Sequence, residues 1–177
     1  MATVLLTPIA FVDDQALIQL AKPIKQQFQY DLRIVDIHLE LEDCYNAERT
    51  QYSANDILEK LIGAHPDNDS KIVGVTDLDL YIPVLTFIFG QAYLNGRAAI
   101  VSAHRLRNEY YGLDPNTDLF WKRLEKLIIH ELGHSFGLIH CSNLDCVMIS
   151  STYVEEIDQK SINLCDDCFR MISNNPI

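Results

Sequence analysis

The pattern of apolar and polar positions predicts alternating strands and helices in the first part of the chain. Residues 3–11 form an apolar run, which is typical of a buried strand. The next segment predicts a helix that runs to about residue 28, with a kink near Pro23, because proline disrupts helical hydrogen bonding. Residues 32–41 then alternate between apolar and polar side chains, as a half-buried strand does.

The middle of the chain contains one predicted helix and three predicted strands, over residues 54–64, 71–80, 85–93 and 97–106. Ser53 or Asn55 can cap the helix, since both side chains accept hydrogen bonds from the backbone of a first helical turn. Asn95 and Gly96 separate the last two strands and are a strong signal for a tight turn. We therefore expect these two strands to pair as an antiparallel hairpin.

The last third of the chain begins with a long predicted helix over residues 118–136, and Gly137 follows it. Beyond this glycine the pattern becomes irregular and rich in cysteine, with short helices expected over residues 155–160 and 165–172. The order of the elements predicts an α/β fold whose sheet is mostly parallel with one antiparallel strand.

The length and composition are those of one folded domain, residues 1–177, in which we expect an N-terminal subdomain over residues 1–137 and a small C-terminal one over residues 138–177. The net charge of −11, from 25 acidic and 14 basic residues, argues against partners such as nucleic acid or an anionic membrane. No apolar run is long enough to span a bilayer, and no basic residue precedes the apolar N-terminus as in a secretory signal. We expect a cytoplasmic monomer.

Three histidines and a glutamate have the spacing of a catalytic zinc site, in the run His130-Glu131-Leu-Gly-His134-Ser-Phe-Gly137-Leu-Ile-His140. The first two histidines are four residues apart, so they point to the same side of a helix and can bind one metal ion. Gly137 can adopt the left-handed conformation that ends a helix, which lets His140 return to the metal. Three protein nitrogens leave a fourth position open for water.

This run predicts hydrolysis by an activated water molecule. Zinc lowers the pKa of a bound water to about 7 and polarises a carbonyl. Glu131 is predicted to accept the proton of that water as general base and to pass it to the leaving amine. An amphipathic core helix would explain the leucines of this segment, but not three histidines and a glycine at these positions. The group that stabilises the oxyanion is not identified, and Tyr110, Tyr111 and Tyr153 are candidates.

Four of the five cysteines form two short pairs near the end of the chain, Cys141 with Cys146 and Cys165 with Cys168. This spacing is close to that of structural zinc sites, in which four thiolates complete the coordination. Such a site would hold the chain where His140 leaves the helix, because Cys141 directly follows it. Two disulfide bonds are the alternative, and a reducing cytoplasm disfavours them. Cys44 is expected to be an isolated small core residue.

In this chain the histidine run continues directly into Cys141 and is followed by Cys146-Val-Met148 and Cys165-Asp-Asp-Cys168. Together these residues resemble the signature of the archaemetzincins. The resemblance implies a minimal metzincin fold, with a twisted sheet, an antiparallel edge strand along the cleft and a small C-terminal subdomain held by zinc. It implies a catalytic Zn²⁺ on the three histidines, with Glu131 as base, and a structural Zn²⁺ on the four cysteines. It also implies that Met148 lies in a turn beneath the catalytic metal, whereas simple core packing is the alternative.

The expected function is therefore that of a zinc metallopeptidase acting on a peptide or protein substrate, and the sequence leaves open whether it cuts internal bonds or trims amino termini. Substrate is expected to pair with an exposed strand, residues 87–94 or 97–103. The alternatives are a zinc-binding module that acts by binding peptides or proteins, and a latent enzyme whose cleft is covered by a loop such as residues 110–116. The retained Glu131 favours catalysis, because a site that only binds zinc needs no base.

Overall fold

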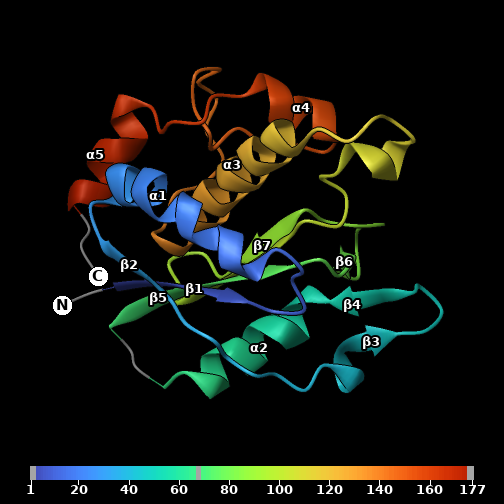
Figure 1. The fold of residues 1–177 in the computed structure, drawn as a ribbon. Helices are drawn as coiled ribbons and strands as arrows, with labels where there is room; N and C mark the ends of the chain where they lie inside the picture. The colour runs from blue at the N-terminus through green and yellow to red at the C-terminus, as the bar shows by residue number, and fades with distance from the viewer. Residues whose placement is uncertain (1–2, 67–68, 175–177) are drawn as a thin grey trace.

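The computed structural model describes residues 3–66 and 69–174 and has a central β-sheet with helices on both faces (Figure 1). The sheet has the order β2-β1-β5-β8-β7, formed by Asp31–Ile34, Thr3–Pro8, Ser70–Thr76, Ala98–Ser102 and Gly90–Ala92. Its first four strands pair in parallel, and β7 pairs antiparallel to β8 at the edge. The predicted α/β fold with a mixed sheet is confirmed.

Two hydrophobic cores lie on the two faces of this sheet. α2 (Ala54–Ala64) covers one face, where Leu5 and Ile72 are buried, and the other face holds a larger core under α1 (Ala21–Phe28), α3 (Thr117–Ser135) and α5 (Asp166–Asn174) (Figure 1). Neighbouring strand residues face opposite cores, because side chains alternate along a strand. α3 packs on β7 and β8, which carries its C-terminal end toward the antiparallel edge of the sheet.

The helices predicted over residues 54–64 and 118–136 are confirmed, each with a side-chain cap. Ser53 caps α2, since its Oγ accepts a hydrogen bond from the Asp56 backbone at 3.4 Å. Asn116 caps α3 by accepting from the Leu119 backbone at 3.0 Å. The predicted short helices correspond to α4 (Val154–Gln159) and α5. No helix in residues 3–66 and 69–174 is long and apolar enough to cross a membrane.

The hairpin predicted from Asn95 and Gly96 is confirmed, but its strands are shorter than expected. The Gly96 N–H donates to the Tyr93 carbonyl over 2.8 Å, and Asn95 has a φ of 52°. Upstream of β7 the chain turns away from β8, and the Ile88 N–H donates to the Leu80 carbonyl over 3.0 Å instead.

The predicted helix that ends near residue 28 is two elements in the structure, a 3-10 helix, η1 (Asp14–Leu20), followed by α1. Pro23 does not interrupt α1, which is continuous from Ala21 to Phe28. It lies in the first turn, where a backbone N–H has no acceptor within the helix. Proline has no backbone N–H, so the helix loses no hydrogen bond at this position. The change from the 3-10 helix to the α-helix occurs before the proline, between Leu20 and Ala21.

The strand predicted over residues 32–41 is also wrong for most of its length. β2 ends at Ile34, and Val35 adds one hydrogen bond to the Leu6 carbonyl at 3.0 Å. Beyond it, Ile37 and Leu39 pack partly buried against the α2 core without belonging to a strand. The alternation thus reflects one buried side of a segment that pairs with no strand in the part of the chain that the structure describes.

A second, three-stranded sheet was not predicted and contains β3 (Tyr45–Asn46), β4 (Gln51–Ser53) and β6 (Leu80–Tyr81). β6 is the end of the strand predicted over residues 71–80, which is interrupted after β5. There the Asp77 carboxylate accepts the Val12 N–H at 2.8 Å, and the Thr76 hydroxyl accepts the Leu78 N–H at 3.1 Å. Side chains that accept backbone hydrogen bonds compete with strand pairing.

Candidate metal centre and active site

Three histidines come together where α3 ends. His130 and His134 lie on one side of the helix, and His140 returns from the segment that follows it. Their ligand nitrogens lie within 4.8 Å of one another, and the Nε2 atoms of His130 and His134 are 3.1 Å apart. Two nitrogens bound to one zinc ion at their usual bond lengths are about 3.4 Å apart, so these residues fit a zinc ion.

Gly137 makes the turn that returns the chain to the other histidines. Its φ is +92°, a conformation that other residues rarely adopt, and the Leu138 N–H donates to the Gly133 carbonyl over 3.0 Å. The predicted left-handed end of the helix is confirmed. The same helix end is tied to the β7–β8 hairpin, because the Asn95 N–H donates to the His134 carbonyl over 2.9 Å.

Backbone carbonyls hold two of the imidazole rings. His130 Nδ1 lies 2.9 Å from the Val147 oxygen, and His134 Nδ1 lies 2.7 Å from the Leu138 oxygen. A carbonyl only accepts, so each Nδ1 carries a proton and each Nε2 presents a lone pair. Burial lowers the pKa of His130 well below its ordinary value and also lowers the pKa of His134 and His140, which favours the neutral form that binds metal.

Glu131 is buried beside the histidines, with 6% of its surface exposed. Burial raises the pKa of its carboxyl to about 8, and a cation at the histidines would favour the carboxylate and lower that pKa. Gly90 of β7 lies directly against it, since a Cβ at this position would be 2.6 Å from the Glu131 Cγ and 2.7 Å from Oε1. A glycine inside a strand often marks such a close approach, so Gly90 could have been predicted from the sequence.

The histidines and Glu131 line a cleft of about 540 Å³. The segment leading into β7 contributes one part of its lining, and residues 150–152 contribute another. The three tyrosines proposed for the oxyanion, at positions 110, 111 and 153, do not line the cleft, so that expectation is not supported. Residues 110–116 do not line it either, and the loop considered as a cover for the cleft therefore lies elsewhere.

Lys160 lines the same cleft and was not predicted. It follows α4 and is 5% exposed. Burial lowers the pKa of its amine to about 8, while the nearby Glu131 acts in the opposite direction. Nothing in the local sequence distinguishes this lysine from an ordinary helix-end residue, because its place in the cleft depends on contacts with distant segments.

Met148 is fully buried under α3, in a turn closed by the Ile149 N–H donating to the Cys146 carbonyl over 3.3 Å. Its carbonyl accepts the Cys141 N–H at 3.0 Å, next to the last histidine. A Cβ at Gly133 would lie 2.5 Å from the Met148 Sδ, so the glycine of the helix makes room for the methionine. Met148 thus packs against the helix that carries His130 and His134, and its place in a turn beneath the catalytic metal stays a prediction of the resemblance.

We expect Gly133→Ala to lower the free energy of unfolding by about 1–3 kcal/mol, the usual cost of overpacking a core. Gly63→Ala in α2 is the matched control, because nothing lies within 4 Å of a Cβ there. That control should gain about 0.5–1 kcal/mol from the better helix propensity of alanine. Urea denaturation measures both. Equal gains in the two variants would show that the methionine does not need the space at Gly133.

The four cysteines near the end of the chain also come together, with their Sγ atoms within 4.8 Å of one another. Cys141 and Cys165 are 3.9 Å apart, and Cys146 and Cys168 are 3.8 Å apart. Two thiolates on one zinc ion are separated by about 3.8 Å, whereas a disulfide needs about 2.05 Å. The Cys165 N–H donates to the Cys146 Sγ at 3.4 Å, as is common around metal-bound thiolates. The geometry fits a zinc ion better than two disulfides.

The fifth cysteine, Cys44, lies apart from this cluster. It is 1% exposed and packs in the core under α2, as expected of a small apolar residue. Burial raises the pKa of its thiol to about 11, so it stays protonated and is a poor metal ligand or nucleophile.

Comparisons with known proteins concern the family and the fold of the chain. The chain matches the model of Peptidase family M54 over residues 16–174. It is 36% identical over 170 residues to an archaemetzincin of Methanocaldococcus jannaschii, which covers 96% of this chain and 92% of the relative. A solved zinc-dependent peptidase from Methanocorpusculum labreanum superposes with a TM-score of 0.85 at 28% identity, covering 96% of this chain and 99% of that one. A solved archaemetzincin from Methanopyrus kandleri superposes with a TM-score of 0.84 at 33% identity, covering 99% and 94% of the two chains.

Proposed function

Since the chain belongs to peptidase family M54, the archaemetzincins, and is a zinc metallopeptidase, we propose that it hydrolyses peptide bonds with Glu131 as general base. The observation that carries the proposal is the convergence of three histidines beside a buried carboxylate in one cleft. His130, His134 and His140 are the proposed ligands of the catalytic zinc. The glutamate distinguishes this arrangement from a site that only holds metal.

The chain's own residues set up the proposed chemistry. A bound zinc ion supplies a Lewis acid that polarises a carbonyl and lowers the pKa of water. Carbonyl groups of the backbone hold the imidazoles of His130 and His134 in the tautomer that leaves Nε2 free. Glu131 accepts a proton in the cleft and returns it to the nitrogen of the leaving amine. Gly90 supports this role, because it lets the carboxylate lie against β7.

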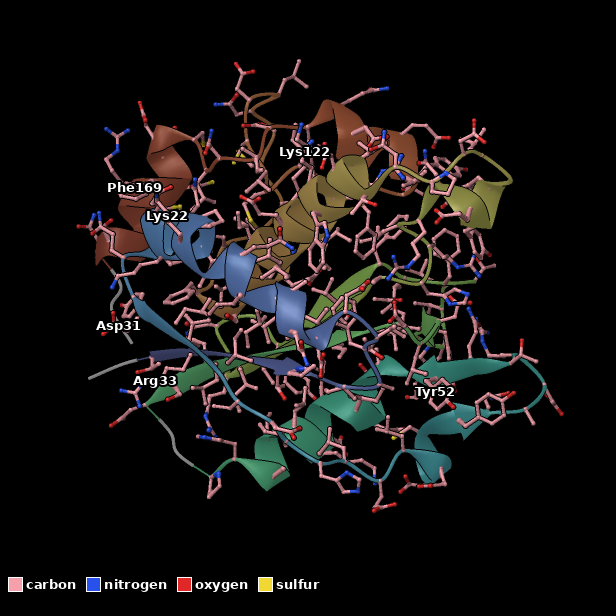
Figure 2. The ribbon with its side chains drawn as sticks, viewed as in Figure 1. Lys22, Asp31, Arg33, Tyr52, Lys122 and Phe169 are labelled. Atoms are coloured by element: carbon pink, nitrogen blue, oxygen red, sulfur yellow. The ribbon has the colours of Figure 1, made fainter. Side chains whose placement is uncertain are left out.

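The two edges of the large sheet differ in a way that supports substrate binding at β7. At the β2 edge, Asp31 and Arg33 are exposed (Figure 2), and charged side chains on an edge strand discourage pairing with another chain. At the β7 edge, Leu85, Leu94 and Ile139 are exposed and line the cleft. We propose that an extended peptide pairs with β7 and places apolar side chains on these residues.

The four clustered cysteines support a second, structural zinc ion. In this proposal the ion holds residues 138–177 as a small subdomain, and it fixes the turn that contains Met148 and the segment that carries His140. Four thiols without a disulfide are also in keeping with the predicted cytoplasmic location.

The proposal is tested by incubating the zinc-loaded chain with a diverse peptide library and identifying products by mass spectrometry. We expect cleavage that stops when 1,10-phenanthroline removes the zinc and returns when zinc is added back. The positions of the cuts distinguish internal cleavage from removal of amino-terminal residues. If the zinc-loaded chain binds library peptides and leaves all of them intact, it is a peptide-binding module and the proposal is wrong.

A further inference from the structure

Lys160 places a buried amine in the wall of the cleft. It lines the cleft together with Glu131 and the three histidines. Its Nζ lies 3.4 Å from His130 Nδ1, which is on the opposite side of the imidazole ring from Nε2. The amine therefore lies about one imidazole ring away from the proposed metal position.

This amine has few partners. Its one clear acceptor among the described residues is the Ile149 carbonyl, at 3.2 Å. His130 Nδ1 gives its own proton to the Val147 oxygen, so it cannot also accept one from Lys160. Although Glu131 lines the same cleft, the two side chains do not form an ion pair. A buried ammonium with a single carbonyl partner is costly, and such groups in a cleft are frequent in functional sites.

Ser151 adds a second polar group to the cleft. Its Oγ is buried and has no hydrogen-bond partner among the described residues, and the residue lines the cleft with Lys160. Buried hydroxyl groups are nearly always hydrogen-bonded in folded proteins. An ammonium with one carbonyl acceptor and a hydroxyl with no partner among the described residues line the same cleft, and together they indicate a ligand that accepts hydrogen bonds from both.

The charge of the cleft indicates the chemistry of that ligand. The whole chain has a net charge of −11, but Glu131 is the one carboxylate among the described residues that line the cleft. Asp77 and Asp79, which follow β5, pair with arginines instead. A zinc ion and the Lys160 ammonium together outweigh the single negative charge, so the cleft favours an anionic group.

From these contacts we infer that Lys160 and Ser151 form a subsite that binds a carboxylate of the substrate next to the scissile bond. The carboxylate is either the side chain of an aspartate or glutamate or the C-terminus of the peptide. The inference rests on the proposed peptidase function and names a substrate class for it. Lys160 is then a specificity-determining residue and is not required for hydrolysis itself.

Three short peptide hydroxamates test the subsite by binding alone. In the first probe, the residue next to the hydroxamate is a glutamate whose C-terminus is an amide. In the second probe, that residue is a glutamine, again with an amide at the C-terminus. In the third probe, it is an alanine with a free C-terminal carboxylate. Calorimetry with the zinc-loaded chain should show about ten- to hundredfold tighter binding of at least one carboxylate probe than of the glutamine probe, the range of one charged hydrogen bond. Whichever carboxylate probe binds tighter identifies the source of the carboxylate.

Matched variants test whether the preference for carboxylate probes depends on Lys160 and Ser151. Lys160→Met keeps the length of the side chain and removes the charge, and it should abolish the preference for the carboxylate probes. Lys126→Met is the control, because Lys126 also donates to carbonyls, at 2.8 and 2.9 Å, but does not line the cleft. Ser151→Ala should weaken the preference, and it provides an independent test if Lys160→Met does not fold.

The outcomes separate this inference from the proposed hydrolysis. Equal affinity of the parent chain for all three probes, or a preference that survives both Lys160→Met and Ser151→Ala, would overturn the subsite. A parent chain that prefers a carboxylate probe but cleaves no peptide would support the subsite and contradict the hydrolysis. A chain that cleaves neutral and acidic peptides with equal kcat/KM and binds the probes equally would contradict the subsite alone.

Discussion

Replacing Glu131 by glutamine is expected to lower kcat by about 10²- to 10⁴-fold, the range for losing a general acid–base group. Glutamine has nearly the same size, so it still fits against Gly90, but it cannot accept a proton. The fold should not suffer, since a buried neutral amide replaces a carboxyl whose pKa burial raises to about 8. Cleavage of a library peptide by mass spectrometry gives kcat, and elemental analysis gives the zinc content.

Glu125→Gln is the matched control for this prediction. Glu125 lies on the same helix, and burial also raises the pKa of its carboxyl, but it does not line the cleft. We expect this variant to keep the parent kcat. The role of Glu131 as base would be contradicted if Glu131→Gln kept its zinc and cleaved peptide at a rate close to that of Glu125→Gln.

Cys168→Ser is expected to cause the largest loss of stability. The variant should lose one zinc ion per chain and more than about 4 kcal/mol of unfolding free energy, as metal loss from a structural site does. Cys168 lies in α5, and its Sγ is next to that of Cys146, which lies two residues before Met148. Peptidase activity should therefore fall as well, because the turn under the histidines loses its anchor. Zinc analysis and thermal denaturation measure the two effects.

Cys44→Ser separates the loss of metal from the cost of a polar atom in a core. Both cysteines are buried, but Cys44 belongs to the core under α2 and has no place in the cluster. Its replacement should cost about 1–3 kcal/mol for an unpaired hydroxyl and leave the zinc content unchanged. If both variants keep the same zinc content and the same stability, the cysteine cluster does not hold a structural ion.

Local patterns were enough to predict much of the fold and the candidate site. The apolar faces of α2 and α3, the Ser53 cap of α2 and the Asn95-Gly96 turn of the hairpin depend on residues that are close in sequence. The histidine run is equally local, since a helix followed by Gly137 fixes where its side chains point. Spacing also favoured zinc over disulfides for the cysteine pairs, and the distances between their Sγ atoms fit that interpretation.

The errors arose where a local pattern has more than one tertiary outcome. Residues 32–41 alternate as a strand does, but among the described residues only the first part has a neighbouring strand to pair with. Pro23 breaks helices in their interior, yet here it occupies a first turn that tolerates it. The small β3-β4-β6 sheet has strands too short to give any periodic signal.

The sequence by itself was enough to predict the helices α2 and α3, the β7–β8 hairpin, the family resemblance and the histidine, glutamate and cysteine sets, because each of these rests on spacing within a short segment. The tertiary structure alone decided what surrounds them. Gly90 lies against Glu131, and Lys160 lies beside His130 although 30 residues separate the two in sequence. Such contacts depend on how helices and strands pack, and no local pattern records them. For that reason the chemistry of hydrolysis could be predicted from the sequence, while the groups that select a substrate became visible only in the folded chain.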